Sequence, residues 1–270
     1  MNRLFRAVAA CAFAFSLAAA STVVRATDYA DLWWNPTESG WGLMTSHQGD
    51  KIFITFYVFR VDRSGTWFNG LIQATTPGGP TYTGELYQAS GPYYGGAFTP
   101  PATNRSVGNV TFTATSPTTA TVTYTVDGVT VSKNVERLTL ALHNLSGTYI
   151  GSFLSVNHTC ANPLNNFRQF NGSGTFTIAH APPAPAVTIT AVLTDNFVNF
   201  TCTYTGTYGQ LGKIGSIAGT YTCTSGQNGS WNATEIEPST LGGILGRYSA
   251  TNVPLGCQVT GGFGGLKQVF

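Results

Sequence analysis

Apolar and polar residues alternate in short runs along the chain, and each run ends in residues that favour turns. In the first half these runs are GWGLMTSH, KIFITFYVFRV, TWFNGLIQ, TYTGELYQ, YYGGAF, SVGNVTFTAT, ATVTYTV and VTVSKNVERLTL. A two-residue period over such short lengths is typical of half-buried strands, whereas no long window shows a helical period. The first half is therefore predicted to hold about eight strands joined by short turns.

The strongest turn signal in the chain is Asp127-Gly128, which favours a two-residue hairpin. Before it, Val122, Tyr124 and Val126 share one face of a strand, and threonines occupy the other face. An antiparallel meander of eight strands tends to close into a barrel, because closure removes exposed strand edges. A β-sandwich is the alternative architecture.

The second half repeats this pattern in GTFTIAH, AVTITAVL, VNFTCTYT, SWNATEIE and CQVTGGF. Gly-Thr-Tyr occurs three times, ending at Tyr149, Tyr208 and Tyr221, and Gly-Arg-Tyr at Tyr248 is a near copy. About eight strands are again expected. The predicted fold class is all-β, with two tandem antiparallel meander domains, each a barrel of about eight strands.

The N-terminus has the features of a secretory signal peptide. Arg3 and Arg6 precede the apolar run AVAACAFAFSLAAA, which is too short to span a bilayer. Small residues allow cleavage after Ala20 or Ala26. We therefore expect a signal peptide at 1–26, followed by domains at 27–142 and 143–270, and export to the periplasm or the extracellular space.

Charge excludes one class of function. The chain has a formal net charge of +2, but losing Arg3, Arg6 and Arg25 leaves 10 of its 13 basic residues against 11 acidic ones. The mature chain then carries −1 and has no basic patch, which argues against nucleic-acid binding. No later stretch is apolar for long enough to form a transmembrane helix, and the sequence leaves the oligomeric state open.

The cysteines divide the chain. Apart from Cys11 in the signal region, all of them lie in the second half, and an even number in an exported chain implies two disulfides. A hairpin around residues 209–215 would bring Cys202 opposite Cys223. In a closed barrel the first and last strands are neighbours. We therefore predict the pairs Cys202–Cys223 and Cys160–Cys257, and neither a metal site nor a cofactor.

The most distinctive motif is WWNPTESGWG, residues 33–42, followed by an aromatic strand and by Ser64-Gly65-Thr66-Trp67. This pattern resembles an uncharacterised module of exported proteobacterial proteins, and the likeness covers about residues 29–140. The resemblance implies bacterial origin and export, and it implies no activity.

The layout is also similar, more loosely, to that of lipocalin and avidin-like barrels, which begin with a Gly-x-Trp strand. Those barrels often place a basic side chain of the last strand over that tryptophan. By this analogy, Arg137 would stack on Trp41 as a cation–π contact and close the first barrel. Glu38 would either bind backbone amides of residues 39–42 or pair with Arg137.

The aromatic residues of the first half are the candidates for ligand binding. Trp33 and Trp34 are adjacent and face opposite ways in a strand, so at most one points inward, and we expect Trp34 to be exposed. The candidate ligand-contacting residues are Trp33, Trp34, Glu38, Trp67, Tyr93 and Tyr94. The competing interpretation is that the tryptophan motif closes the barrel and Tyr93-Tyr94 is ordinary loop packing.

The sequence contains no G-x-S-x-G element and no phosphate-binding loop, and its four histidines are scattered. We therefore expect a non-catalytic exported protein that binds a glycan or a small apolar ligand at aromatic-rich loops. The alternatives are a glycoside hydrolase that uses Asp31 or Glu38 as its carboxylate, and a purely structural envelope protein.

Overall fold

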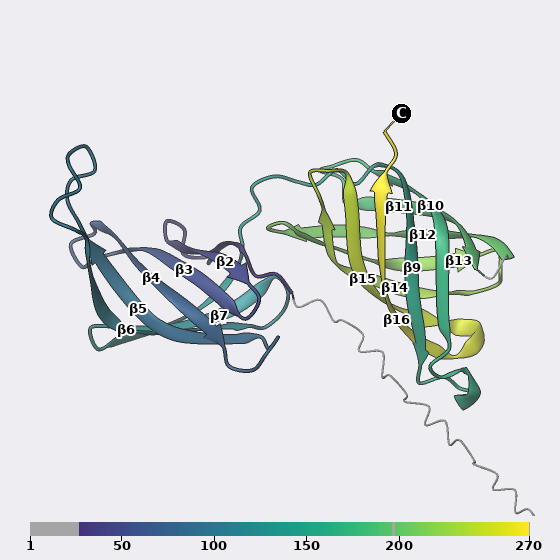
Figure 1. Ribbon diagram of the computed structural model, residues 1–270. Coiled ribbons are helices and arrows are strands. Elements are labelled where there is room, and N and C mark those ends of the chain that lie inside the picture. Colours follow the sequence, from purple (N-terminus) through teal and green to yellow (C-terminus); the bar gives the residue numbers. More distant parts are fainter. Residues whose placement is uncertain (1–26, 196–197, 270) are drawn as a thin grey trace, which may run out of the picture.

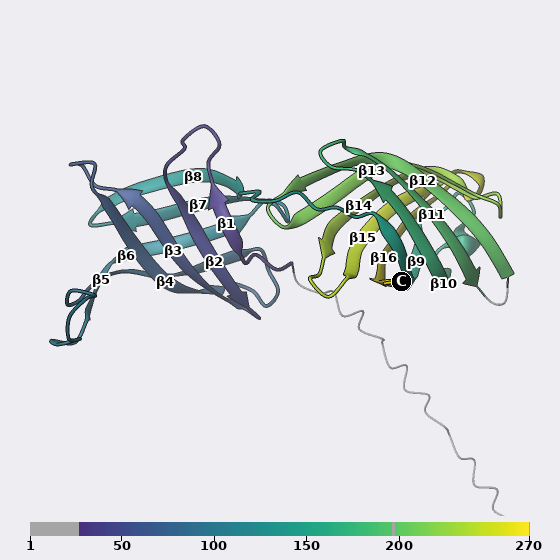
Figure 2. The same cartoon turned by 90° about the horizontal axis from the view of Figure 1, so that it is seen from above.

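The computed structural model describes residues 27–195 and 198–269, which form two closed barrels, each of eight antiparallel strands (Figures 1 and 2). The prediction of two all-β barrels in tandem is confirmed, and the sandwich alternative is wrong. The expected signal peptide lies outside the described residues. Across the part of the chain that is described, no helix is long and apolar enough to span a membrane.

The strands of barrel 1 are β1 (Asp31–Trp34), β2 (Gly42–Gln48), β3 (Lys51–Phe59), β4 (Gly65–Ala74), β5 (Thr81–Ser90), β6 (Thr103–Ala114), β7 (Thr119–Val126) and β8 (Val129–Arg137). Each strand pairs with the next along the chain, and β1 closes the barrel on β8 with Trp33 opposite Arg137. Alternate residues point inward, and residues such as Ile54, Phe56 and Phe112 fill the interior.

The strands of barrel 2 are β9 (Gly147–His158), β10 (Gln169–His180), β11 (Ala186–Asp195), β12 (Val198–Leu211), β13 (Ile214–Cys223), β14 (Asn228–Pro238), β15 (Gly243–Asn252) and β16 (Cys257–Lys267). Two 3-10 turns, Pro163–Asn165 and Val253–Leu255, lie in connections at one end. Here β16 closes the barrel on β9.

The strands of barrel 1 differ from the predicted ones in two places. YYGGAF is not a strand but part of the long loop between β5 and β6, because glycines and nearby prolines disfavour a strand ladder. The missing strand is the four-residue β1, which is too short to show a clear alternation. The Asp127-Gly128 hairpin is confirmed: it joins Val126 to Val129, and both turn residues have positive φ.

Rows of hydroxyl groups cross the outer surfaces of both barrels. On barrel 1, neighbouring strands place Thr83, Thr111, Thr123 and Ser132 side by side. The corresponding row on barrel 2 contains Thr148, Thr177, Thr190, Thr203 and Thr222. Some neighbours are hydrogen-bonded to each other, as with Thr123 and Ser132, whose oxygens are 2.9 Å apart. These β-branched residues suit a pleated surface that faces water.

Inside barrel 2, aromatic rings pack over glycines of neighbouring strands. A Cβ on Gly246 would meet the Phe263 ring, and a Cβ on Gly261 would meet both the Tyr248 ring and the backbone of Leu154. These glycines let strands bend and approach closely, and the rings cover the backbone that the glycines leave bare. The repeated glycine-aromatic pattern of the second half therefore helps the barrel to close.

Both predicted disulfides are present, and both lie at the same end of barrel 2. Cys202 and Cys223 occupy opposite positions of β12 and β13. Cys160, just after β9, bonds to Cys257 at the start of β16. The second bond therefore ties together the two strands whose pairing closes the barrel.

The two barrels contact each other through the turn between β12 and β13. Gly212 has a φ of 60° in this turn, and a Cβ there would collide with Asp31 and Arg137. The next residue, Lys213, donates through Nζ to Asp28 Oδ2 at 2.6 Å and through its backbone to Asp31 Oδ2 at 3.2 Å. A glycine is required here because barrel 1 packs directly against this turn.

A pH-dependent contribution to stability is expected from Asp28. Burial opposes its ionisation, but hydrogen bonds from His47 and Lys213 outweigh that effect and lower the pKa of the carboxyl well below its usual range. Asp28→Asn should therefore reduce the free energy of unfolding at neutral pH. Because the folded-state pKa is the lower one, this deficit should shrink as the pH falls below about 3.9, the ordinary value. Urea unfolding at several pH values measures the difference, and a deficit that is constant with pH would contradict this account.

Candidate functional site

The tryptophan motif is divided between the interior and the surface of barrel 1. Trp33 is buried, 1% exposed, and its Nε1 donates to Thr45 Oγ1 at 2.9 Å. Its assignment as a ligand-contacting residue is therefore wrong, because protein atoms surround it. Trp34 is partly exposed on the outer side of β1, so the expectation that one of the two rings points inward is confirmed.

Arg137 closes barrel 1 on a different tryptophan from the predicted one. Its guanidinium lies 4.8 Å from the ring centroid of Trp33, and the side chain is fully buried. It donates to Asp31 Oδ2 at 3.0 Å, to Pro117 O at 2.8 Å and to Asp28 O. The predicted contact with Trp41 is wrong because strand pairing places Trp33, not Trp41, opposite Arg137.

Trp41 and Glu38 lie at the other end of barrel 1. Trp41 packs partly buried against the core and donates through Nε1 to Glu38 Oε2 at 2.9 Å. Lys133 Nζ is 2.7 Å from Glu38 Oε1, so the expected pairing of Glu38 with Arg137 is wrong. The hydrogen bond from Lys133 lowers the pKa of Glu38. Through these contacts, the residues just before β2 are held against Lys133 of β8.

The remaining candidates, Trp67, Tyr93 and Tyr94, lie on the outside of barrel 1. Trp67 points outward from β4, directly across from Tyr57 of β3, and both are about half exposed. Tyr93 and Tyr94 contact each other in the β5–β6 loop, with tilted rings whose centroids are 4.6 Å apart. The outer face of β2, β3 and β4 also exposes Met44, Phe53, Phe59 and Leu71. The exposed aromatic residues of β3 and β4 therefore share one outer face of barrel 1, and Tyr93 and Tyr94 lie separately on a loop.

The carboxylates of the hydrolase hypothesis are not brought together. Asp31 begins β1 and pairs with Arg137, whereas Glu38 follows the end of β1 and pairs with Lys133. A glycosidase needs two carboxyl groups that face each other across the scissile bond. Within 27–195 and 198–269, no group of three or more His, Cys, Asp or Glu side chains is arranged to hold a metal ion.

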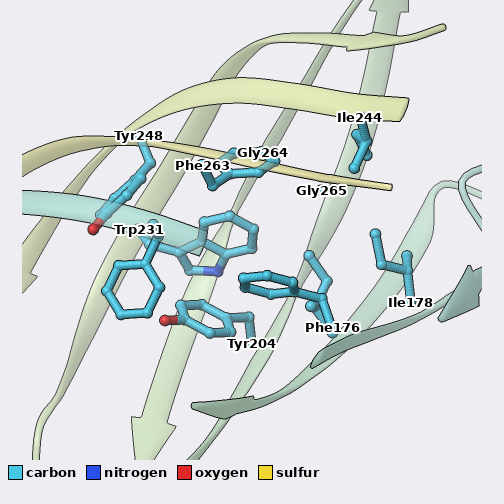
Figure 3. Close-up of a pocket in the computed structure, with 11 residues that line it drawn as sticks. Phe176, Ile178, Tyr204, Trp231, Ile244, Tyr248, Phe263, Gly264 and Gly265 are labelled. Carbon is cyan, nitrogen blue, oxygen red and sulfur yellow. The ribbon is translucent and has the colours of Figure 1, made fainter. Parts of the chain in front are cut away.

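The interior of barrel 2 contains a cavity in two adjacent compartments that share three lining residues. The inner compartment, of about 60 Å³, is lined almost entirely by carbon (Figure 3). The residues that line it include Phe176, Ile178, Ile189, Trp231, Ile244 and Phe263. The outer compartment, of about 260 Å³, lies at the disulfide end, and Phe153, Tyr204 and Tyr248 line both.

Polar groups gather where the outer compartment reaches the end of the barrel. They include Asn157, Arg168, Gln169, Asp195, Gln227 and Asn252. The cavity thus changes from apolar at its inner end to polar at its mouth. Arg168 and Asp195 bring opposite charges to this mouth, so it does not favour one sign of charge.

Three tyrosines line the middle of this cavity from separate strands. Tyr204 and Tyr221 stack with centroids 5.5 Å apart, and Tyr221 donates to Thr251 O at 3.1 Å. Burial raises the pKa of Tyr248 to about 12 and also raises the pKa of Tyr204 and Tyr221. Their hydroxyls therefore stay protonated at neutral pH and offer uncharged hydrogen-bonding groups to a ligand.

The chain was compared with protein-family models, curated proteins and solved structures, and no match was found.

The sequence patterns predicted the candidate site in the first half of the chain, and they did not predict the cavity in the second half. One signal was available: every strand of barrel 2 except β11 places a glycine in the inward phase, Gly206 and Gly219 among them. Inward glycines contribute no side chain to the interior. In barrel 1 those positions mostly carry Ile, Phe or Val, which fill the core.

Proposed function

We propose that this chain is an exported, non-catalytic binding protein whose second barrel holds a small, largely apolar molecule. The observation that carries the proposal is the aromatic-lined cavity, which runs from an apolar inner end to a polar mouth. Eight-stranded barrels are wide enough inside for one small ligand. The two disulfides are compatible with an oxidising compartment outside the cytosol.

The size and chemistry of the cavity support this assignment. Binding pockets for small molecules are mostly apolar, contain a few polar groups and typically measure about 300–1,000 Å³. The two compartments together fall at the lower end of that range. The rings of Tyr204 and Trp231 pack edge to face, with centroids 5.0 Å apart. Together they offer ring faces and ring edges to a planar ligand.

The uncharged probe N-phenyl-1-naphthylamine, which fluoresces strongly in apolar surroundings, tests the proposal. We expect a saturable fluorescence increase with the mature protein. Asn157→Trp places a large ring in the mouth and should weaken binding at least about tenfold, as loss of roughly 1.4 kcal/mol would. The matched control is Asn199→Trp, the same change on the outer face at the same end of the barrel, which should leave binding unchanged. Binding that is absent, or equal in both variants, would refute the proposal.

A second candidate is contact with a neutral glycan on the outer surface of barrel 1. The observation in its favour is that Tyr57 and Trp67 lie side by side and half exposed, and exposed aromatic surface commonly marks a contact site. In the same titrations, soluble glycans replace the probe. A tryptophan fluorescence shift that Trp67→Ala abolishes would support this candidate, and no shift with any glycan would dismiss it.

A further inference from the structure

Two buried polar atoms in barrel 2 have no hydrogen-bond partner among the described residues: Trp231 Nε1 and Asn252 Oδ1. The two residues are 4% and 6% exposed. An unpaired buried polar group costs about 1–3 kcal/mol, and nearly all such groups in native proteins are paired. Both residues line the cavity, Trp231 its inner compartment and Asn252 its outer one. A bound ligand that supplies a hydrogen-bond partner to each of these two atoms would remove this cost.

The surroundings of Trp231 favour an organic acceptor over water. Figure 3 shows the indole nitrogen directed toward the rings of Tyr204 and Phe176. An aromatic face is a weak acceptor for an N–H group. A water molecule requires two to four polar partners, and the inner compartment is lined almost wholly by carbon. An apolar ligand that carries one acceptor oxygen would fit the carbon lining of the inner compartment and would accept a hydrogen bond from Trp231 Nε1.

The positions of the two residues on neighbouring strands set the approximate length of the ligand. Trp231 of β14 lies opposite Ala250 of β15, and Asn252 is two residues further along β15 on the same inner face. Diagonal neighbours of this kind lie about 7–8 Å apart. A fused two-ring body spans that separation, with one end deep in the barrel and the other toward the mouth.

We infer that the ligand is an uncharged ring compound that carries two polar groups. This inference rests on the proposed function. A carbonyl oxygen at its inner end accepts a hydrogen bond from Trp231 Nε1, and a hydroxyl nearer the mouth donates to Asn252 Oδ1. Arg168 and Asp195 at the mouth bring one charge of each sign, so a charged head group has no advantage there. The apolar lining of the inner compartment accommodates the rings.

A pair of probes that differ only in the acceptor tests the inner contact. 2-Acetylnaphthalene and 2-isopropylnaphthalene have nearly the same shape, and each competes with N-phenyl-1-naphthylamine for the wild-type protein. We expect the ketone to compete about tenfold better, the effect of one hydrogen bond in a buried site. Trp231→Phe, which keeps a ring without the N–H, should abolish the preference. The control Trp67→Phe, on the outside of barrel 1, should retain it.

The outer contact is tested in the same way. 6-Acetyl-2-naphthol adds a hydroxyl to the ketone probe at the far end of the ring system. The wild-type protein should bind it roughly threefold or more tightly than 2-acetylnaphthalene, within the usual range for one neutral hydrogen bond. Asn252→Leu, which keeps the side-chain size but removes the acceptor, should cancel that gain.

A spectroscopic measurement keeps the test independent of whether Trp231→Phe folds. In ¹⁵N-labelled wild-type protein, the Nε1–H resonance of Trp231 should move downfield with the ketone and much less with the hydrocarbon. Equal competition by the two probes and no selective shift would overturn this inference while leaving the proposed function intact. If N-phenyl-1-naphthylamine itself fails to bind, the proposed function fails instead.

Discussion

Replacing Arg137 with methionine is expected to lower the free energy of unfolding of barrel 1 by about 3–5 kcal/mol, the usual cost of breaking a buried ion pair. The guanidinium is fully buried and donates to Asp31 and to the carbonyls of Asp28 and Pro117. Methionine retains packing over Trp33 but leaves those acceptors unpaired and the Asp31 charge uncompensated. The loss should thus exceed that of an ordinary cavity of similar size.

Urea unfolding followed by tryptophan fluorescence measures this effect, because four of the five tryptophans belong to barrel 1. The matched control is Arg105→Met, which removes an exposed pair with Asp127 in the same barrel. Exposed pairs contribute about 0–1 kcal/mol. If Arg137→Met cost no more than Arg105→Met, Arg137 would not be the residue that holds the closing strands of this barrel.

Removing the Cys160–Cys257 bond should produce the largest loss in barrel 2. The two cysteines are 97 residues apart, whereas Cys202 and Cys223 are separated by 21. The chain-entropy model gives about 4.7 kcal/mol for a loop of roughly 100 residues and about 3 kcal/mol for one of roughly 15. The longer bond restricts the unfolded chain more, and it also ties together the strands whose pairing closes the barrel.

Calorimetry of the two double alanine variants checks the order. Cys160→Ala with Cys257→Ala should lower the transition of barrel 2 further than Cys202→Ala with Cys223→Ala. The transition of barrel 1 is the internal reference, because that barrel contains no cysteine. The reverse order, or an equal shift in both barrels, would mean that loop length does not determine the contribution of these bonds.

Much of the fold followed from local patterns in the sequence. Two-residue alternation identified most strands, Asp127-Gly128 identified a hairpin, and the order of four cysteines gave the correct pairing. These signals succeed because strand periodicity and turn chemistry act over a few residues. The loop at Tyr93-Tyr94 was mistaken for a strand because its aromatic residues have high strand propensity, while the nearby prolines and glycines decide its structure.

The partner of Arg137 was not predictable from local sequence. The alternation of side chains along a strand predicts that Trp33 and Trp34 face opposite ways, but it does not indicate which of the two side chains points inward. That choice depends on the pairing of β1 with β8, about a hundred residues later in the chain. A shift of one residue in this register would have exchanged the two rings.

The cavity in barrel 2 could not be predicted from the sequence for a related reason. Whether the interior of a barrel is filled depends on the combined volume of side chains from eight strands. No short sequence motif contains that information. The inward glycines of barrel 2 become informative only when the phase of each strand is known. Trp231 lay outside the tryptophan motif and received no role, yet it is the tryptophan whose ring lines the cavity.

The threonine rows on the outer surfaces have a consequence for how the protein meets other molecules. Hydroxyl groups hold water through short-range hydrogen bonds and generate no long-range field, and only 9% of residues in the chain are charged. Encounters therefore proceed without electrostatic steering, whose strength falls with ionic strength. A protein with such a surface is expected to associate with its partners at similar rates in dilute and in saline solution.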